Sequence, residues 1–244
     1  TIATAIPILI IIPTKRGGFF MKIVEKNEFI QKSNDTLLSI LDMLEKLPVV
    51  RFGEIEADKA ALIIIDMTNG FAKEGALKSD AVEELIPKVC ELSAICDKLK
   101  IRKIAFADCH TDESPEFDAY PKHCLKGTAE SEIVDEIKNI GGYTLIEKNS
   151  TNGFLEEAFR NWLSENPDIN TFILTGDCTD ICVQQFATTL RAYYNKNNKR
   201  ARVIVPLNAV DTYDLGQHDR NLMNVMAAYN MIINGVEVVE DIIE

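Results

Sequence analysis

The fold is decided by one stretch, residues 171–183, which reads TFILTGDCTDICV. Its first half is a short run of apolar and β-branched residues, a pattern typical of a strand buried on both faces. Gly176 then permits a sharp turn, and Thr179 or Asp180 can cap a following helix. The stretch therefore predicts a buried strand that leads through a tight turn into a helix, with Cys182 in the first turn of that helix.

The same alternation of strand and helix continues on both sides of this stretch. Strand followed by helix, repeated, gives right-handed crossovers and a parallel sheet covered by helices on both faces. The sequence therefore predicts an α/β fold, a three-layer α/β/α sandwich with a mainly parallel six-stranded, Rossmann-like sheet. Ligands of such sheets bind beyond the carboxyl ends of the strands. The predicted strands are 61–65, 103–107, 143–146, 171–175, 202–206 and 236–239, and the predicted helices are about 80–100, 129–139, 154–165, 180–197 and 217–234.

Composition narrows the function classes. The 244 residues are 46% hydrophobic and 26% charged, which is enough for one large domain with a full core. The formal net charge of −12 opposes binding to a phosphate backbone, so we expect no nucleic-acid partner. The six cysteines lack paired CxxC spacing, and in a chain of this size they indicate reduced thiols and a cytoplasmic protein. The sequence contains no GxGxxG or Walker pattern, so a nucleotide is not indicated.

The N-terminal residues fall outside this pattern. Residues 1–20 begin with TIATAIPILIIIP, an apolar run too short to span a bilayer and without the flanks of a signal peptide. Residues 15–20 can be back-translated as a ribosome-binding site ahead of Met21. We therefore interpret residues 1–20 as a translated leader or disordered tail. The alternative is a native N-terminal strand or anchor. Residues 21–59 are predicted to form an arm with a helix over 26–47, whose apolar stripe lies on the main domain or on a second subunit. Residues 60–244 form the main domain; we expect a homo-oligomer and no membrane partner.

Cys182 is the strongest single candidate for a catalytic residue. At the start of a helix, unpaired N–H groups and the helix dipole favour a thiolate, and the same N–H groups can stabilise an oxyanion. The alternative is a buried structural cysteine, which is the commoner fate of this residue type. The position of Cys182 directly after a sheet strand and turn favours the nucleophile.

Asp66 directly follows one predicted strand, and Lys148 comes two residues after the end of another, so we expect them at the same edge of the sheet as Cys182. A carboxylate at the tip of an apolar strand costs desolvation unless it has a partner. Alone, Asp66 would be interpreted as a helix or turn cap, and Lys148 as a solvated lysine. Their shared edge makes both residues candidates for one catalytic group.

A set of nitrogen and oxygen ligands follows the second predicted strand. Asp108 and His110 are two residues apart in an extended segment, so their side chains project to the same side. Glu116 and His123 follow, and two of the three histidines of the chain lie in this segment. Such a set suits one divalent metal ion, zinc first, with iron or manganese as alternatives. Surface histidines with a chance Asp-x-His spacing are the alternative interpretation.

Together these strand-end motifs resemble the isochorismatase-like cysteine hydrolase superfamily, and most closely its nicotinamidase branch. The order and spacing of the motifs carry the resemblance, which covers about residues 60–240 and leaves the arm outside. The resemblance implies a parallel sheet sandwiched by helices, as the periodicity also predicts. The matching motifs are Ile65-Asp66 with Asn69 and Phe71, Asp108-Cys109-His110, Pro121-Lys122-His123-Cys124 with Gly127-Thr128, Lys148 with Phe154, and Leu174-Thr175-Gly176 with Thr179-Asp180-Ile181-Cys182-Val183.

The resemblance also implies a role for each residue. Asp66, Lys148 and Cys182 would form a catalytic triad, in which Asp66 takes the thiol proton and later delivers it to ammonia, while Lys148 lowers the thiol pKa. The oxyanion hole would follow a cis peptide bond between Asp177 and Cys178. In nicotinamidases the metal binds the pyridine nitrogen of the substrate. The remaining implied residues are the amides of Cys178 and Cys182 in the oxyanion hole, the metal ligands Asp108, His110 and His123, and the pocket residues Phe71, Tyr120 and Asp177; Glu116 is a candidate fourth metal ligand.

The predicted reaction is hydrolysis of nicotinamide to nicotinate and ammonia through a thioester. Three departures from the family pattern bear on the substrate: Thr68 stands where many relatives carry Gln, no aromatic residue lies between Lys148 and Phe154, and Asp177 replaces a typically apolar residue. The charge of Asp177 could select an amine-bearing substrate or repel an anion. Another small amide, a carbamoyl compound or an isochorismate-like substrate is the alternative. The alternative from a different functional class is a catalytically silent protein that serves as an interaction scaffold.

Overall fold

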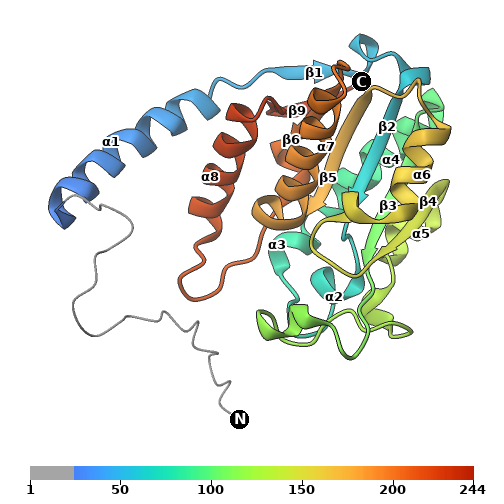
Figure 1. The fold of residues 1–244 in the computed structure, drawn as a ribbon, viewed down its shortest axis with the longest axis horizontal. Coiled ribbons are helices and arrows are strands. Elements are labelled where there is room, and N and C mark those ends of the chain that lie inside the picture. The colour runs from blue at the N-terminus through green and yellow to red at the C-terminus, as the bar shows by residue number, and fades with distance from the viewer. Residues whose placement is uncertain (1–24) are drawn as a thin grey trace. The chain divides into compact units, whose positions relative to one another are not determined.

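The computed structural model describes residues 25–244, and Figure 1 draws their ribbon. These residues belong to two units: one ends at Ser39, and a compact one runs from Ile40 to Glu244 and holds the sheet. The leader expected over residues 1–20 lies outside the described residues. The helix predicted over 26–47 is confirmed as α1 (Lys26–Leu44). None of the described helices is long and apolar enough to cross a bilayer.

The predicted parallel sheet is confirmed. Its six predicted strands are β2 (Ala60–Ile65), β3 (Arg102–Asp108), β4 (Tyr143–Lys148), β5 (Thr171–Asp177), β6 (Arg202–Pro206) and β8 (Glu237–Val239). They lie in the order β4-β3-β2-β5-β6-β8, and every neighbouring pair is parallel. A seventh strand, β7 (Val210–Asp211), pairs with the end of β5. The sequence does not predict β7, because two residues are too few to show a period.

Three strands continue beyond their predicted ends. β3 includes Asp108, β4 includes Lys148 and β5 includes Asp177. These side chains therefore project from the sheet itself rather than from the loops that follow it. The register of β3 and β4 places Asp108 directly opposite Lys148. Chemistry-bearing side chains in a hydrogen-bonded ladder are held more rigidly than side chains in a loop.

Side chains of β2 alternate between two core clusters, which explains why the sheet is buried on both faces. Leu62 and Ile64 pack into one cluster, and Ala61 and Ile63 into the other. The helices divide between the two faces in the same way, so the predicted three-layer sandwich is confirmed (Figure 1). The first cluster includes α4 (Ile86–Leu99) and α5 (Asp135–Ile140), the second includes α6 (Glu157–Glu165), α7 (Gln184–Lys196) and α8 (Arg220–Ile233), and α2 (Asn69–Ala72) and α3 (Asp80–Glu83) are short helices after β2.

A second, two-stranded sheet lies within the compact unit. β1 (Val49–Arg51) pairs in parallel with β9 (Asp241–Ile243). Val50 and Phe52 are buried and belong to the first core cluster. The sequence does not predict this sheet, because its two strands are short and lie far apart in the chain. These residues, which the sequence assigns to the arm, therefore pack into the core of the compact unit.

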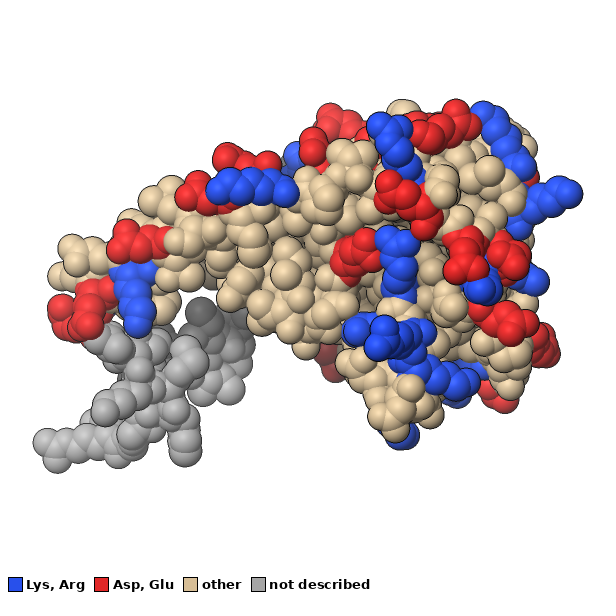
Figure 2. Space-filling view, turned by 90° about the horizontal axis from the view of Figure 1, so that it is seen from above, with Lys and Arg blue, Asp and Glu red and all other residues tan. Residues whose placement is uncertain are grey.

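Charged side chains of both signs are interspersed over the compact unit on the face seen in Figure 2. The chain as a whole carries 38 acidic and 26 basic side chains. An interspersed surface weakens the field of any one sign at a distance.

Candidate active site

The carboxyl ends of β2, β3, β4 and β5 meet at one edge of the sheet (Figure 1). Ile65 at the end of β2 is in register with Gly176 of β5. A Cβ atom at Gly176 would lie 1.9 Å from the carbonyl oxygen of Ile65, and the φ of 110° at Gly176 is one that L residues rarely adopt. Glycine therefore allows the two strands to approach closely. Asp66 follows Ile65 and Asp177 follows Gly176, so the two aspartates occupy matching positions at the carboxyl ends of their strands.

Asp66, Lys148 and Cys182 lie together at this edge. The Nζ atom of Lys148 is 2.8 Å from Oδ2 of Asp66 and 3.7 Å from Sγ of Cys182. It also donates a hydrogen bond to the carbonyl oxygen of Ser150 at 3.1 Å. The three side chains are nearly inaccessible to water: Asp66 is 0%, Lys148 1% and Cys182 6% exposed. The structure thus brings the three residues of the predicted triad together around one lysine ammonium.

The backbone at Cys182 differs from the prediction. The residue lies in a π-helical turn, Thr179–Val183, and not in the first turn of α7, which begins after this turn. The N–H of Val183 donates to the carbonyl oxygen of Cys178 at 3.1 Å, the wide i to i+5 bond of such a turn. Residue types do not distinguish this turn from an ordinary helix start, so the sequence could not reveal it. π-helical turns are frequent at functional sites.

Burial and neighbouring charges set the protonation states of Asp66, Cys182 and Lys148. Burial and the nearby Asp108 carboxylate raise the pKa of Asp66 to about 7, although the Lys148 ammonium opposes the shift. Burial also raises the pKa of the Cys182 thiol well above its usual range, against the lowering effect of Lys148. Burial alone would lower the pKa of Lys148, but Asp108 and Asp66 raise it, so the lysine is charged. The resting site holds a thiol, an ammonium and a carboxyl group that exchanges its proton near neutral pH.

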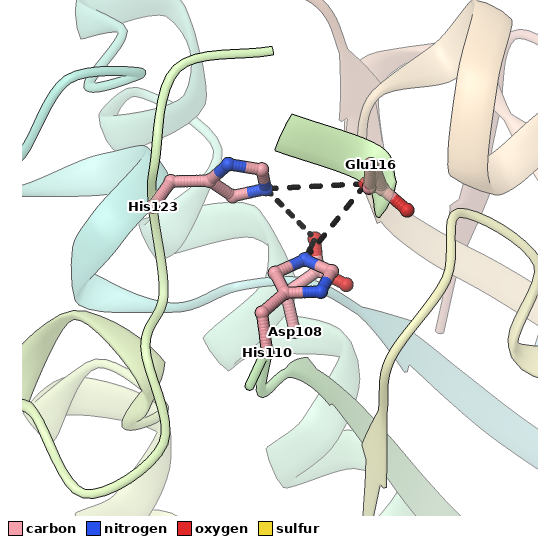
Figure 3. A group of neighbouring side chains, drawn as sticks. All are labelled: Asp108, His110, Glu116 and His123. Carbon is pink, nitrogen blue, oxygen red and sulfur yellow. Dashed lines mark ion pairs between the residues drawn. The ribbon is translucent and has the colours of Figure 1, made fainter. Parts of the chain in front are cut away.

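Asp108, His110, Glu116 and His123 converge on one point (Figure 3). Nε2 of His110 lies 3.6 Å from Oδ2 of Asp108 and 3.8 Å from Oε1 of Glu116. Nε2 of His123 lies 3.7 and 4.0 Å from the same two oxygens. Bonds from zinc to nitrogen and oxygen ligands are about 2.0–2.2 Å long, so ligand atoms at these separations can surround one ion. The four predicted residues therefore form one possible metal-binding cluster.

Hydrogen bonds of the two histidines in this cluster orient them as ligands. Nδ1 of His110 lies 3.1 Å from Oδ1 of Asn149, and Nδ1 of His123 lies 2.8 Å from the carbonyl oxygen of Pro121. When Nδ1 donates in these bonds, the Nε2 lone pair is free to bind a metal. Nε2 of His110 is buried and has no hydrogen-bond partner among the described residues. The donor set therefore fits a divalent cation.

One contact joins the metal-binding cluster to the predicted triad of Asp66, Lys148 and Cys182. Nζ of Lys148 also donates to Oδ1 of Asp108, whose other oxygen faces the histidines. Burial alone would raise the pKa of Asp108, but the lysine and both histidines lower it below its usual range, so the carboxylate is charged. The sequence does not predict this contact, because it does not specify which residues of β3 and β4 stand opposite each other. A single lysine thus contacts the thiol, Asp66 and a carboxylate of the cluster.

A pocket opens onto both Cys182 and the metal-binding cluster. Phe71, Tyr120 and Asp177, the three predicted substrate residues, line it together with Cys178 and Cys182. The sequence does not predict Leu77, Ser79, Val82, Thr151 and Tyr213 as wall residues, because they come from separate segments and share no motif. The other lining residues are Asp108, Glu116 and His123 of the metal-binding cluster, and Leu77, Ser79, Val82, Thr151, Ile181 and Tyr213.

His218, the third histidine of the chain, supports one wall of the pocket and is not a predicted site residue. Its ring stacks on Tyr213, with centroids 4.0 Å apart and planes at 12°. Its Nε2 atom lies 2.8 Å from Oδ2 of Asp180, in the turn that carries Cys182. Asp180 therefore ties the Tyr213 loop to this turn instead of serving as the predicted helix cap. A histidine in a polar loop is equally typical of a solvated residue, so the sequence carries little signal here.

Asp177 lines the pocket, and its surroundings disfavour a charge. The peptide bond between Asp177 and Cys178 is cis, as the resemblance implies. Burial and the neighbouring Asp66 raise the pKa of Asp177 well above its usual range, which favours the neutral carboxylic acid. The expectation that a negative charge at this position selects an amine or repels an anion stays a prediction, and burial, which depends on the fold and not on the residue type, acts against that charge.

The fold and the pocket are those of an α/β protein with a ligand-sized site beyond the carboxyl ends of its parallel strands. The model of the Isochorismatase domain matches residues 60–236. This match covers most of the chain, and the chain belongs to the isochorismatase family. The predicted superfamily and its nicotinamidase branch are confirmed by this match and by the named relatives.

Three relatives illustrate the similarity. Nicotinamidase 1 of Arabidopsis thaliana is 34% identical over 172 residues, which cover 64% of this chain and 67% of that protein. The structure of a nicotinamidase from Bacillus subtilis matches with a TM-score of 0.63 and 26% identity, over 75% of this chain and 99% of that one. The structure of N-carbamoylsarcosine amidase from Thermoplasma acidophilum matches with a TM-score of 0.61 and 26% identity, over 74% and 95% of the two chains.

Proposed function

We propose that the protein is a cysteine amidohydrolase that converts nicotinamide to nicotinate and ammonia. The observation that carries the proposal is that one pocket is lined by both the Cys182 thiol and the Asp108 carboxylate, with Lys148 in contact with both. A metal-binding cluster beside a nucleophile suits a substrate whose ring donor atom lies at a fixed distance from its amide. The similarity to two nicotinamidases supports the same reaction.

Asp66, Lys148 and Cys182 form the proposed catalytic triad. Asp66, with a pKa of about 7, takes the thiol proton, and the Lys148 ammonium 3.7 Å from Sγ stabilises the thiolate. The thiolate attacks the amide carbon and forms a C–S bond. The backbone N–H groups of Cys178 and Cys182 stabilise the oxygen that becomes negative.

The same aspartate completes the reaction. Collapse of the tetrahedral intermediate breaks the C–N bond, and Asp66 returns its proton to the departing nitrogen, so that ammonia leaves. A thioester then links the acyl group to Cys182. Asp66 accepts a proton from the water that attacks this thioester, and that proton returns to the sulfur as nicotinate leaves.

Asp108, His110, Glu116 and His123 are the residues that would hold one divalent metal ion, zinc first, with iron or manganese as alternatives. When bound, the metal supplies a Lewis acid that accepts the lone pair of the pyridine nitrogen. The rings of Phe71 and Tyr120 lie 5.5 and 6.3 Å from the His123 ring, between centroids. These two aromatic side chains therefore flank the cluster and can hold a flat substrate ring.

The test of this proposal compares kcat/KM for nicotinamide and benzamide, before and after metal removal by a chelator. Benzamide has the same amide on a ring of the same size but lacks the ring nitrogen. We expect the metal-loaded enzyme to prefer nicotinamide by about 100-fold or more, since one good contact is worth about 3 kcal/mol. Without metal the preference should disappear. Equal rates for the two amides in the metal-loaded enzyme contradict nicotinamide as the substrate.

His110→Ala is the matched control for this experiment. Elemental analysis should find metal in the parent protein purified without chelators and little in the variant. Cys182 of the variant should still react with a thiol reagent, because His110 does not contact it in the structure. A parent protein without metal under these conditions would exclude a metal role.

A linear carbamoyl compound is the second candidate substrate, favoured by the similarity to N-carbamoylsarcosine amidase. Other small amides and an isochorismate-like compound belong to the same alternative, since none of them needs a ring nitrogen. For these substrates we expect product release that does not depend on the metal. A catalytically silent scaffold is the alternative of a different class, and failure of a thiol-reactive substrate analogue to label Cys182 would support it.

We propose a cytoplasmic location for this chemistry. All six cysteines lie in the described residues and are free. Two of them, Cys178 and Cys182, line the pocket. A reducing compartment keeps such thiols available, which is what a thiol nucleophile requires.

We propose that the arm over residues 21–59 contributes through α1 to a contact between subunits of a homo-oligomer. The apolar stripe of α1, which includes Leu37, Leu38 and Leu41, needs a surface to cover it. A chain that begins at Glu45 keeps β1, which pairs with β9, and is expected to form a smaller oligomer in light scattering. Its kcat/KM should stay within about threefold of the parent value, because no proposed catalytic residue is removed. An unchanged oligomer with unchanged solubility would contradict this role.

A further inference from the structure

Asp177 is a pocket residue whose side chain has no task in the reaction described above. It is 1% exposed and lines the pocket. Its Oδ1 atom has no hydrogen-bond partner among the described residues. Its Oδ2 atom lies 3.6 Å from the thiol of Cys178, which is only a weak donor. A buried carboxyl oxygen without a partner is costly, so a ligand that fills the pocket is a natural source of the missing donor.

A structural role does not explain this carboxyl group, as its neighbour on β7 demonstrates. Asp211 stands opposite Asp177 in the β5–β7 ladder. The carboxylate of Asp211 accepts hydrogen bonds from the N–H of Thr212 and from the side chains of Arg220 and Asn224. The hydrogen bonds of Asp211 therefore anchor the loop after β7. Asp177, in contrast, has a carboxyl oxygen without a partner beside the pocket.

The position of Asp177 determines which substrate atom its side chain can contact. Asp177 lies beside Asp66, the proposed base, because the residues before them are in register. It also directly precedes Cys178, whose N–H is a proposed oxyanion donor. The substrate atoms near both groups are the oxygen and nitrogen of the reacting amide rather than the far edge of the ring. The oxyanion hole holds the oxygen, which leaves the two N–H donors of the amide nitrogen.

We propose that Oδ1 of Asp177 accepts a hydrogen bond from the NH2 group of the substrate and makes the pocket selective for primary carboxamides over esters. The inference rests on the proposed amide hydrolysis and specifies its substrate class. A primary amide brings the N–H donor that the unpaired oxygen lacks. An ester brings only lone pairs at the same place, and a site built for a donor rejects a substrate that lacks it.

The raised pKa of Asp177 suits this task. A negative charge at Asp177 would oppose ionisation of the adjacent Asp66, which must accept the thiol proton. Burial and Asp66 raise the pKa of Asp177 well above its usual range, which favours the neutral acid and reduces this conflict. A neutral carboxyl group still accepts a hydrogen bond through its carbonyl oxygen. An asparagine side chain offers the same acceptor in the same shape, which provides a conservative variant.

The test compares kcat/KM for nicotinamide and for methyl nicotinate, which share the ring and the carbonyl group and differ in the leaving group. We expect Asp177→Leu to lower the value for nicotinamide by about 10- to 100-fold and the value for methyl nicotinate by less than about threefold. Asp177→Asn keeps the acceptor oxygen and should retain the value for nicotinamide to within about tenfold. The preference for amide over ester should therefore fall in the leucine variant and survive in the asparagine variant.

Leu77→Ala is the matched control, because it changes packing at the wall of the same pocket without a polar group. It should change both values by a similar factor, and thermal unfolding of every variant checks the fold. If Asp177→Leu lowers the values for amide and ester equally, the inference is overturned while nicotinamide hydrolysis stands. If the parent enzyme does not hydrolyse nicotinamide, the proposed function fails and the inference fails with it.

Discussion

Cys182→Ala is expected to lose amide hydrolysis by about four to six orders of magnitude while keeping its fold and its metal content. The variant removes the sulfur that attacks the amide carbon in the proposed reaction, so the thioester cannot form at this position. The side chain is small and 6% exposed, so its truncation disturbs little of the core. None of the four metal-binding residues is altered, and elemental analysis should give the parent value.

Ammonia release measures this effect, and mass spectrometry of the parent enzyme during turnover should find an acyl group on Cys182. Cys178→Ala is the matched control, because Cys178 also lines the pocket but is proposed to act through its backbone N–H. This control should stay within about tenfold of the parent activity. Turnover by Cys182→Ala within about 100-fold of the parent would exclude Cys182 as the nucleophile.

The four inner strands of the central sheet, β3, β2, β5 and β6, were predictable because both of their faces are buried. In β2 every residue is at most 1% exposed, so the whole strand consists of apolar residues and is visible in the sequence as an unbroken run. The strands that escape prediction, β1, β7 and β9, have two or three residues each. Pairing partners, rather than a local pattern, determine these three strands, whereas β8, also three residues long, lies in the β-branched stretch 236–239 that the sequence shows. The three become recognisable only when the chain is folded.

Site residues were predictable where a strand end or a family motif marks them. Asp66, Lys148 and Cys182 each follow or end an apolar run, and a parallel sheet brings such ends to one edge. The contact of Lys148 with Asp108 depends on the register of β3 and β4, which no residue type encodes. The raised pKa of Asp177 depends on burial by distant segments. Motifs thus identify the participants, and the fold determines which of them touch and which carry charge.

Lys148→Met is expected to lower kcat/KM by about 1000-fold or more and the free energy of unfolding by about 3–5 kcal/mol. Methionine has a similar length but leaves Asp66 and Asp108 without their shared cation. Both carboxyl groups are fully buried, so water cannot replace the ammonium. The variant therefore tests whether one lysine supports both the fold and the chemistry.

The pH dependence of Lys148→Met separates its two effects. Lys148 lowers the pKa of Asp66, which is about 7 when the lysine is present. Removing the lysine raises that pKa, so a smaller fraction of Asp66 is ionised at pH 7 and fewer thiols can be deprotonated. The acid limb of the kcat/KM profile should therefore move to higher pH in the variant. Urea unfolding at pH 7 measures the stability effect separately.

Lys103 on β3 provides the matched control, since it is a second buried lysine with no place in the pocket. Its Nζ atom lies 2.7 Å from Asp97 and 3.0 Å from Oγ of Ser93, and the Asp97 side chain is 45% exposed. Water can solvate Asp97 when the lysine is removed, so Lys103→Met should lose only about 1–2 kcal/mol of stability and keep its kcat/KM. Equal losses of kcat/KM in the two lysine variants would mean that Lys148 acts through stability alone, and its place in the triad would have to be abandoned.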